Sequence, residues 1–333
     1  MVDSYHKIQP LARLSRILLT GGTGFFGRSI LRRLLTVRSL GVIGPRVVVL
    51  SRSPESFLSN YPEFKDLSWL EFCRGDVLNY ASLPTDSRFS HVLHAATEST
   101  IGPSLEAIYR YDEIVCGTRN LLDYAVKNNI SRFLLTSSGG VYGPQPGSIS
   151  TIDEAYLGIP DPLDPLSAYS MAKRAAEHLC CLYSDQHGIE VCIARCFSFF
   201  GPDLPRTAHF AIGNFVHDAL NSHNIVIEGD GSPIRSYMDQ DDLADWLLRI
   251  LDSGTSCEAY NVGSNEAISI HDLAHLVASI FGPNIAVEVL GRSNYLGRNR
   301  YVPDISKINK ELGLNVSISL RESLSRVAKL TCN

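Results

Sequence analysis

Tyr169 and Lys173, in the segment SAYSMAK, are the two residues of this sequence best suited by type and spacing to acid–base chemistry. Residues four apart lie on the same face of a helix. A tyrosine in water has a pKa of about 10. A lysine ammonium one turn away stabilises the phenolate and lowers that pKa toward neutrality. We therefore predict that Tyr169 exchanges a proton with a substrate and that Lys173 tunes it.

Two serine hydroxyls complete this candidate centre. Ser137 and Ser138 end the apolar run RFLLTSS, thirty-one residues before the tyrosine. Open α/β sheets bind ligands at the carboxyl ends of their strands. A serine, a tyrosine and a lysine around a nicotinamide form a proton relay for carbonyl–alcohol chemistry. Because the spacing Tyr-x-x-x-Lys alone is common by chance, the prediction depends on a cofactor motif elsewhere in the chain.

That motif is GGTGFFG, which follows the strand-like RILLT and precedes a helical pattern. Gly21 permits a tight turn, Gly24 lets a diphosphate approach the backbone, and Gly27 lets helix and strand pack closely. The N–H groups at the N-terminus of the helix then hold the phosphates. The segment predicts a dinucleotide site.

The end of the second strand bears on which dinucleotide binds. Sites for NAD usually carry an acid there for the ribose hydroxyls. Here VVVLSRS ends in Ser51, Arg52 and Ser53 with no acid, and serine and arginine suit a 2′-phosphate. We predict NADP in preference to NAD. Asp76, followed by Val77 at the end of the third strand, either approaches the adenine or caps its own loop.

The elements that position these residues alternate along the chain. Strand-like runs cover residues 16–21, 46–53, 68–76, 91–97, 132–138 and 189–199, with amphipathic stretches between several of them. This alternation predicts a Rossmann-type α/β fold with a doubly wound parallel sheet. We expect a dinucleotide-binding domain over 1–199 with returns near 237–262. A smaller, interleaved C-terminal lobe over 200–236 and 263–333 would bind the substrate.

Composition restricts the class of protein. The 333 residues are 44% hydrophobic and carry a net charge of −5. There is no basic tract, and no run approaches the roughly 18 apolar residues of a membrane helix, so we expect neither nucleic acid nor membrane as a partner. The eight cysteines include no CxxC pair. We expect small buried thiols in a reducing compartment, hence a cytoplasmic location, and no metal site.

Motifs along nearly the whole chain strengthen this interpretation. They run from TGGTGFFG through GDV, HVLHAAT, VCGTRNLL, TSSGGVYG, SAYSMAK and ARCFSFFGP to GDGSPIRSYMDQDDLA, YNVGS and VPDISK. In these motifs the chain resembles the extended short-chain dehydrogenase/reductase family, and within it the NAD(P)-dependent nucleotide-sugar epimerase/dehydratase branch. The later motifs favour this branch over reductases of steroids or simple alcohols.

The resemblance implies roles for individual residues. Ser138 and Tyr169 would flank a sugar carbonyl, and Lys173 would bind the nicotinamide ribose. Arg235 and Arg300 would grip the diphosphate of a nucleotide sugar, with Arg292 and Arg298 as alternatives to Arg300. Asp241 and Asp242 are expected to cap the following helix. The expected cofactor-binding residues are Gly21, Gly24, Phe25, Phe26, Gly27, Ser51, Arg52, Asp76, Val77, Ala95, Ala96, Tyr169, Lys173 and Cys196, and the expected substrate-binding residues are Thr97, Ser138, Ser198, Arg235 and Arg300.

Departures from the branch narrow the chemistry. Its dehydratases place Asp-Glu directly after the strand-end hydroxyl residue, where this chain has Gly139 and Gly140. Neither glycine can move a proton, so we predict no 4,6-dehydration by that mechanism. Ser198 and Ile114 replace two asparagines of the family. Glu98 is either an auxiliary acid or a solvated side chain.

Two enzyme activities are favoured over other nucleotide-sugar chemistry, including decarboxylation, and a non-catalytic protein is the rival from a different class. A 4-ketoreductase would reduce a nucleotide-linked 4-keto-6-deoxyhexose with NADPH, whereas a 4-epimerase would retain NAD; Ser51 and Arg52 favour the reductase. A non-catalytic dinucleotide sensor is disfavoured because Tyr169 and Lys173 are both present. The resemblance also implies a homodimer through helices near 105–128 and 168–187, whose apolar residues include Leu121, Leu122, Ala175, Leu179 and Leu182.

Overall fold

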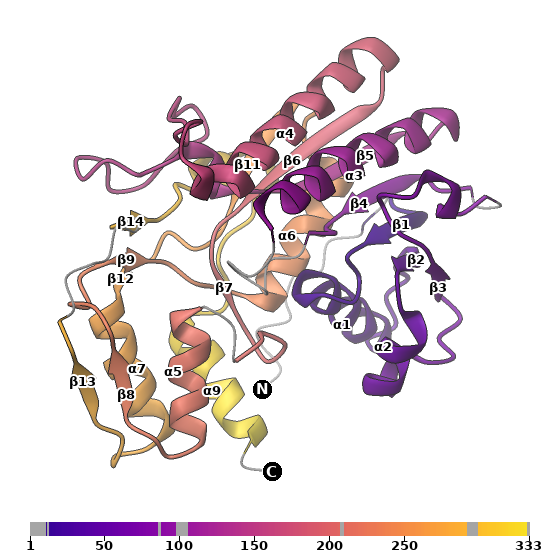
Figure 1. Cartoon of the computed structure of the whole chain (residues 1–333). Helices are drawn as coiled ribbons and strands as arrows, with labels where there is room; N and C mark the ends of the chain where they lie inside the picture. The colour runs from indigo at the N-terminus through magenta and orange to yellow at the C-terminus, as the bar shows by residue number, and fades with distance from the viewer. Residues whose placement is uncertain are drawn as a thin grey trace.

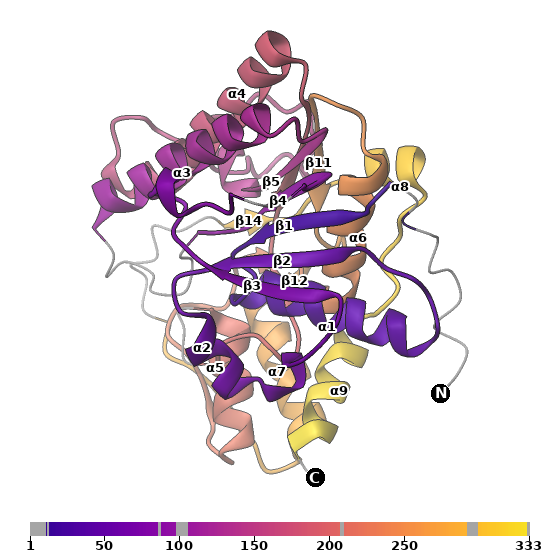
Figure 2. The ribbon, with the colours of Figure 1, turned by 90° about the vertical axis from the view of Figure 1, so that its right-hand side faces the viewer.

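Seven parallel strands form the central sheet of the computed structural model, which describes residues 11, 13–85, 88–97, 106–206, 210–291 and 299–331. Their order is β11-β6-β5-β4-β1-β2-β3 (Figures 1 and 2). The strands are β1 (Arg16–Thr20), β2 (Arg46–Ser51), β3 (Leu70–Arg74), β4 (His91–His94), β5 (Arg132–Ser138), β6 (Glu190–Cys196) and β11 (Glu258–Val262). The sequence order reverses between β1 and β4, so the predicted doubly wound sheet is confirmed.

Helices cover both faces of this sheet, as the near-continuous apolar strands require (Figure 2). One face packs against α1 (Phe25–Ser39) and α6 (Gln240–Ser253), with Leu31, Leu34 and Leu247 in a shared core. The other packs against α3 (Ala107–Lys127) and α4 (Ala168–His187). The short helix α2 (Pro54–Asn60) follows β2, and α8 (Ser306–Leu312) packs near β11.

A second group of elements forms the smaller lobe beside the sheet (Figure 1). Its helices α5 (Ala211–Leu220), α7 (Ile270–Phe281) and α9 (Leu320–Thr331) share a core that includes Phe215, Leu273 and Leu324. The strands β8 (Ile225–Ile227) and β13 (Val287–Val289) pair in parallel. A three-stranded sheet has the order β12 (Ile268–Ser269), β9 (Ile234–Arg235) and β14 (Arg300–Tyr301). A parallel pair, β7 (Phe199–Phe200) with β10 (Met238–Asp239), lies where the chain leaves and re-enters the large domain.

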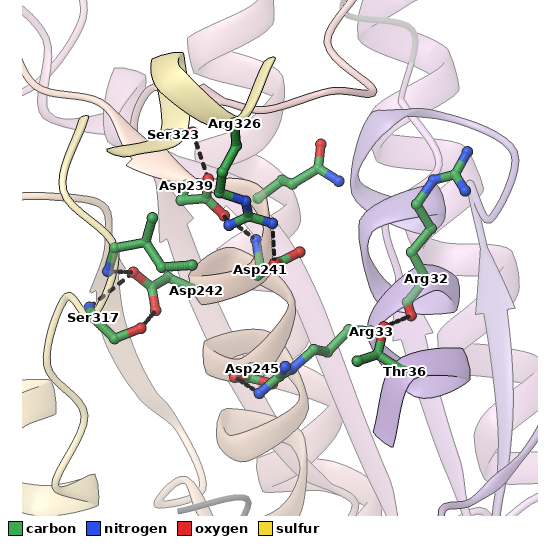
Figure 3. Close-up of polar contacts among 12 residues, drawn as sticks. Arg32, Arg33, Thr36, Asp239, Asp241, Asp242, Asp245, Ser317, Ser323 and Arg326 are labelled. Atoms are coloured by element: carbon green, nitrogen blue, oxygen red, sulfur yellow. Dashed lines mark hydrogen bonds and ion pairs between the residues drawn. The ribbon is translucent and has the colours of Figure 1, made fainter. Parts of the chain in front are cut away.

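Polar contacts fasten α9 to the first turn of α6 (Figure 3). Asp239 caps α6 by accepting the Asp241 amide at 2.8 Å, and it also accepts the Ser323 hydroxyl. Arg326 on α9 contacts both Asp239, at 3.5 Å, and Asp241, at 2.7 Å. The expectation that Asp241 and Asp242 cap the helix is therefore wrong, because the capping carboxylate must precede the first helical turn.

Two further carboxylates of α6 join this helix to its neighbours (Figure 3). Asp242 accepts the amides of Ser317 and Ile318 at 2.9 and 3.0 Å, which fixes the segment that leads into α9. Asp245 binds the Arg33 guanidinium of α1 in a bidentate pair at 2.6 and 2.7 Å. Helix α6 thus connects the small lobe to α1, the helix that follows the glycine-rich turn.

The helices expected to form a dimer pack on each other along their length (Figure 2). Leu121 and Leu122 are fully buried in the core under α3, so they are not part of an outward surface. Ile108 is 78% exposed, and Leu182 is 38% exposed. The homodimer stays a prediction.

The thiols are less uniformly buried than expected. Cys180, Cys192 and Cys196 are buried, but Cys116 and Cys257 are exposed, and Cys332 lies outside the described residues. The described cysteines are all free thiols, and the cytoplasmic location stays a prediction. Within the described ranges, no helix has the length and apolar character needed to span a membrane.

Candidate active site

A cavity of about 480 Å³ opens where β1 and β4 diverge, at the carboxyl end of the sheet. Gly21 and Gly24 follow β1 on one side of it, and Ala95, Ala96 and Thr97 follow β4 on the other. This is the switch point at which open α/β sheets bind ligands. The predicted cofactor motif and the expected residues after the fourth strand therefore line one cavity.

Backbone geometry explains the glycines that follow β1. Gly21 has φ +70°, and a β-carbon on it would lie 2.4 Å from the carbonyl oxygen of Ala95. A β-carbon on Gly27 would lie 2.2 Å from the Cα atom of Gly22, so only glycine permits α1 to approach β1. Gly24 is different, because its nearest neighbour would be at 3.4 Å. It lines the cavity, where a bare backbone admits a phosphate group.

The two phenylalanines of the motif do not line the cavity. Phe26 packs edge-on against Phe199, with ring centroids 5.1 Å apart, and Phe25 packs against both the core shared by α1 and α6 and the core of the small lobe. Their amides begin α1, so any part in binding phosphate comes from the backbone at this helix terminus. Their side chains position the helix.

Ser51, Arg52, Asp76 and Val77 line the opposite end of the cavity, as predicted for the adenosine half of a dinucleotide. The Asp76 carboxylate also accepts the Leu78 amide at 2.9 Å, so it caps its own loop, and its approach to an adenine stays a prediction. Ser51 is buried and Arg52 is exposed at the rim.

Sequence reasoning missed two charged residues of the cavity wall, Arg28 and Glu113. Arg28, in the first turn of α1, donates to the Asp203 carbonyl at 2.6 Å and to the Tyr61 hydroxyl at 2.5 Å. Arg28 directly follows the third glycine of the motif, and this position could have indicated that it lies at the cofactor cavity. Glu113 is buried within α3, and its neighbour Ile114, where the family has asparagine, packs in the core. No local pattern indicated that Glu113 faces the cofactor cavity.

Lys173 lies buried at the end of β4 and β5. Its ammonium donates to the Thr97 hydroxyl at 2.9 Å and to the Thr136 carbonyl at 2.8 Å. Burial lowers the pKa of Lys173 to about 8, while Cys196 and the carboxylates of Glu113 and Glu177 raise it. The lysine is therefore held in place, and its pKa lies close to neutral pH.

Tyr169 lies one turn before this lysine, with the Lys173 ammonium 5.9 Å from the centre of its ring. Burial raises the pKa of the Tyr169 phenol well above its usual range, and the hydrogen bond with Ser138 lowers it in part. We expected Lys173 to bring this pKa toward neutrality. Among the protein's own groups the desolvation effect is larger, so the phenol is protonated at neutral pH.

Ser138 and Cys196 are direct partners in the register of β5 and β6. The Ser138 hydroxyl accepts the Gly140 amide at 3.0 Å, which caps the short helix η5 (Gly139–Tyr142). Burial raises the pKa of the Cys196 thiol to about 12, so it stays neutral. Its carbonyl accepts the Tyr301 hydroxyl at 3.3 Å. Tyr301, which the sequence did not single out, thus reaches the end of β6 beside Ser138.

Aromatic rings fill the space beside Gly139. A β-carbon on this glycine would lie 2.7 Å from the Phe197 ring and 2.8 Å from the Tyr301 hydroxyl. The two rings pack on each other with centroids 4.6 Å apart. An acidic side chain at position 139 therefore requires the rings of Phe197 and Tyr301 to move away from the end of β5.

The two arginines expected to hold a diphosphate have different positions in the small sheet. In the parallel register of β9 and β14, Arg235 pairs with Tyr301, whereas Arg300 pairs with Ile234. Neighbouring residues of a strand point to opposite faces, so Arg235 shares the face of Tyr301 and Arg300 does not. The Arg300 Nε atom donates to the Ser150 carbonyl at 2.8 Å. Only Arg235 shares a face with a residue that reaches the catalytic end.

Several candidates remain without a structural test. Ser198 follows β6, and its carbonyl accepts the Met238 amide at 3.0 Å. Glu98, Arg292 and Arg298 lie outside the described residues. Their roles stay predictions. In the described part of the chain, no cluster of three or more His, Cys, Asp or Glu side chains is suited to a metal ion.

The model of the NAD dependent epimerase/dehydratase family matches residues 17–263. The chain belongs to this family. It is 30% identical to UDP-glucuronic acid decarboxylase 3 of Arabidopsis thaliana over 93% of this chain and 86% of that protein. It resembles the Streptomyces venezuelae dTDP-glucose 4,6-dehydratase DesIV, with NAD and TYD bound, at TM-score 0.80 and 25% identity over 94% of this chain and 96% of that one.

A second solved structure is an epimerase. It is a tyrosine-to-phenylalanine mutant of the Bacillus cereus UDP-glucuronic acid 4-epimerase, in complex with a fluorinated UDP-sugar and NAD. It matches at TM-score 0.79 and 25% identity over 95% of this chain and 99% of that one. The fold, the family and these neighbours together identify the chain as an enzyme of the nucleotide-sugar epimerase/dehydratase class with an NAD-type dinucleotide as its cofactor.

Proposed function

We propose that this enzyme reduces the C4 ketone of a nucleotide-linked 4-keto-6-deoxyhexose with NADPH. The observation that carries the choice of a reductase is the cavity rim, where Ser51 and Arg52 stand at the end of β2 with no acid. Serine and arginine suit a 2′-phosphate, and an external reductant is NADPH more often than NADH. A retained NAD carries no 2′-phosphate and therefore needs no such contact.

The cavity fits a dinucleotide on its own geometry. The bare backbone at Gly24 beside the N-terminus of α1 would hold the diphosphate, and Val77 and Asp76 would enclose the adenine. Ala95, Ala96 and Thr97 would line the path toward Lys173, whose ammonium would bind the nicotinamide ribose. When bound, the dihydronicotinamide supplies the hydride.

The protein's own groups supply the proton. Tyr169 is protonated at neutral pH, which is the form that a ketone reduction requires at its start. Its phenol would give the proton to the C4 oxygen, and Ser138, already hydrogen-bonded to it, would orient that oxygen. The Lys173 ammonium would stabilise the phenolate left behind, because the charge develops in a buried site that is shielded from water. An epimerase must instead begin with the phenolate.

Substrate orientation follows from the small sheet. Arg235 shares a face with Tyr301, and the Tyr301 hydroxyl touches the Cys196 carbonyl next to the catalytic centre. We place the diphosphate of the substrate at Arg235 and its sugar between Tyr301 and Tyr169. A planar guanidinium binds two phosphate oxygens at once. Arg300, on the other face, is left out of this site.

A 4-epimerase with retained NAD is the second candidate. Gly139 and Gly140 favour it equally, since neither reduction nor epimerisation at C4 needs an acid at those positions. Decarboxylation is the third, because a relative at 30% identity is a UDP-glucuronic acid decarboxylase. A non-catalytic sensor is the weakest, since it needs no buried Ser138–Tyr169–Lys173 arrangement.

One experiment separates these candidates. Purified protein is denatured, and any released dinucleotide is identified. Native protein is then incubated with NADPH and dTDP- or UDP-linked 4-keto-6-deoxyhexoses, and separately with UDP-glucuronic acid. Oxidation of NADPH that depends on the keto sugar supports the reductase. Stoichiometric bound NAD without NADPH oxidation supports the epimerase, and release of carbon dioxide from UDP-glucuronic acid supports the decarboxylase.

We also propose a homodimer through the outer faces of α3 and α4, where Ile108, Tyr109 and Tyr111 of α3 and Leu182 of α4 are exposed. Exposed apolar side chains on adjacent helices are typical of subunit interfaces. Sedimentation equilibrium measures the mass directly. A single species at 36.7 kDa at all concentrations would contradict the dimer.

A further inference from the structure

A buried ion pair lies directly behind the proposed catalytic centre. Glu177 on α4 and Arg195 on β6 are joined by contacts of 2.8 Å to the guanidinium NH2 nitrogen and 3.1 Å to Nε. The Glu177 side chain is 9% exposed and that of Arg195 17%. No proposed step of the reaction uses either residue, yet two charges have been taken out of water, which is unfavourable unless their partners are well placed.

We infer that Glu177 and Arg195 are positioning residues, which fix the catalytic end of β5 against α4 and connect it to the substrate-binding lobe. The inference rests on the proposed function, because it assigns these residues to the same Ser138–Tyr169–Lys173 centre. The proposed reaction brings neither residue into contact with substrate or cofactor, so neither is a catalytic residue.

Glu177 is connected to the proposed Ser138–Tyr169–Lys173 centre in two ways. It follows Lys173 by one turn of α4, so both side chains lie on the same face. Its carboxylate also accepts the Ser137 hydroxyl at 2.5 Å. Ser137 immediately precedes Ser138, so this hydrogen bond holds the strand end that carries the catalytic serine. A single carboxylate thereby sets the separation between strand and helix at this point.

Arg195 extends the contact toward the small lobe. Its guanidinium lies 4.8 Å from the centre of the Tyr142 ring, and the Tyr142 hydroxyl donates to the Asn261 side chain at 2.8 Å. The Asn261 amide nitrogen of the side chain then donates to the carbonyls of Ile152, at 2.8 Å, and Asp304, at 3.0 Å.

These last two carbonyls belong to the segments that place Tyr301. The Ile152 amide donates to the Val302 carbonyl at 3.0 Å, and the Asp304 amide donates back to the Ile152 carbonyl at 2.8 Å. Val302 directly follows Tyr301 at the end of β14. A continuous chain of buried polar contacts therefore joins Glu177, beside the catalytic serine, to the strand that presents Tyr301.

The charge of Glu177 also acts on Lys173. The ionisable groups around Lys173 are Tyr169, Glu177 and Cys180 on α4, Glu113 on α3, Cys196 on β6 and His94 on β4. Burial lowers the pKa of His94 to about 3, so it is neutral, and both thiols have raised pKa values. Glu113 and Glu177 are thus the two negative charges that support the Lys173 ammonium against its desolvation.

The same two strands supply a matched control at their other end. Arg132 begins β5 and binds Glu190, which begins β6, at 2.5 Å. This pair joins a nearly fully buried arginine to a glutamate whose side chain is 51% exposed, and it lies at the amino edge of the sheet, away from the cavity. A substitution there tests the general effect of breaking an Arg–Glu pair in this sheet.

The experiment compares Glu177→Gln with Glu190→Gln. The pH dependence of the Lys173 side-chain chemical shift, followed by NMR in protein labelled with 13C-lysine and assigned with the variant Lys173→Arg, measures the pKa of this buried lysine without any turnover. We expect Glu177→Gln to lower it by about one unit, because a negative charge is lost and Arg195 is left uncompensated. The alkaline limb of the kcat profile should move by the same amount, and kcat should fall at least tenfold. Glu177→Asp should restore part of both, and Glu190→Gln should change neither.

Tyr142→Phe tests the connection to the small lobe and keeps the inference falsifiable if Glu177→Gln does not fold. Removal of this one hydroxyl should raise KM for the nucleotide sugar several-fold with kcat nearly unchanged. An unaltered Lys173 titration and kcat in Glu177→Gln, an equal shift in Glu190→Gln, or an unaltered KM in Tyr142→Phe would each overturn the inference. If wild-type protein reduces no keto sugar while Glu177→Gln still shifts the lysine titration, the proposed function fails and the positioning pair stands.

Discussion

The Phe197 ring lies so close to Gly139 that a β-carbon on the glycine would be 2.7 Å from its Cζ atom. The glycine is therefore required by a neighbour 58 positions later in the chain, and not by its own backbone angles. This contact explains why the position that carries an acid in the dehydratases of the family carries none here. The absence of an acid at position 139 can therefore be tested by substitution of Gly139.

Gly139→Asp should not create a dehydratase. We expect the new side chain to displace Phe197 and Tyr301, to lower the free energy of unfolding by roughly 1–3 kcal/mol, and to abolish reduction. Urea unfolding and an assay for water loss from dTDP-glucose measure the two effects. The control is Gly147→Asp, because nothing lies within 4 Å of a β-carbon at that exposed glycine. Gain of dehydratase activity in the Gly139 variant would contradict our account of this position.

Tyr169→Phe should remove the proton donor and leave the cofactor site intact. We expect kcat to fall by roughly 10²–10⁴-fold, the range of general acid catalysis, with the Kd for NADPH changed less than about threefold. Stopped-flow kinetics and fluorescence titration give the two numbers. Tyr183→Phe serves as the control, since Tyr183 is on the same helix and donates to Asp123 at 2.6 Å, away from the cavity. Equal activity in the two variants would exclude Tyr169 as the acid.

Arg52→Ala should change the choice of cofactor. If Arg52 binds the 2′-phosphate, its loss should raise the Kd for NADPH by roughly 10- to 100-fold and leave that for NADH nearly unchanged, because a charge-assisted hydrogen bond is lost. Calorimetry with both cofactors measures this. Arg74→Ala is the control at the same edge of the sheet, where Arg74 is paired with Glu55 and does not line the cavity. An equal loss for NADPH and NADH would show that Arg52 does not read the phosphate.

Asp239 should make stability depend on pH. Burial raises its pKa to about 6, from a usual value of 3.8, while Ser323 and Arg326 lower it in part. The folded protein therefore binds this proton more tightly than the unfolded chain. The free energy of unfolding should decrease by roughly 3 kcal/mol as pH rises from about 4 to about 6.

The variant Asp239→Asn isolates this effect, because the amide keeps an acceptor for the cap of α6 and does not titrate. Urea unfolding between about pH 4 and pH 7 should give a flatter profile for the variant than for the wild type. The carboxyls of Asp242 and Asp245 also have raised pKa values and titrate in both proteins. Identical profiles would show that Asp239 shares the same protonation in the folded and unfolded states.

Features that depend on a few neighbouring residues could be predicted from the sequence. The strand-to-helix turn at Gly21–Gly27 and the pair Tyr169–Lys173 are local patterns with one geometry each. The alternation of strands and helices, with right-handed crossovers, then leaves few possible sheets. For this reason the amino-acid sequence was sufficient to predict the doubly wound sheet and several residues that line the cavity at its switch point.

Features that depend on contacts between distant segments could not be predicted in the same way. Tyr301 reaches the catalytic centre only because β14 pairs with β9, and the same register turns Arg300 to the opposite face. The protonated state of Tyr169 follows from its complete burial, which no spacing reveals. Asp239, and not Asp241 or Asp242, caps α6 because the helix begins one residue later, at Gln240.

The fastening of α9 to α6 has a consequence for how the protein is made. Asp239 and Asp242 acquire their partners Ser317, Ser323 and Arg326 only after some eighty further residues have been translated (Figure 3). During synthesis Asp239 and Asp242 therefore lack these partners until the later segment has been added. The junction between α6 and α9 can therefore form only after residues 317–326 have been synthesised, and it is among the last contacts of the fold to be made.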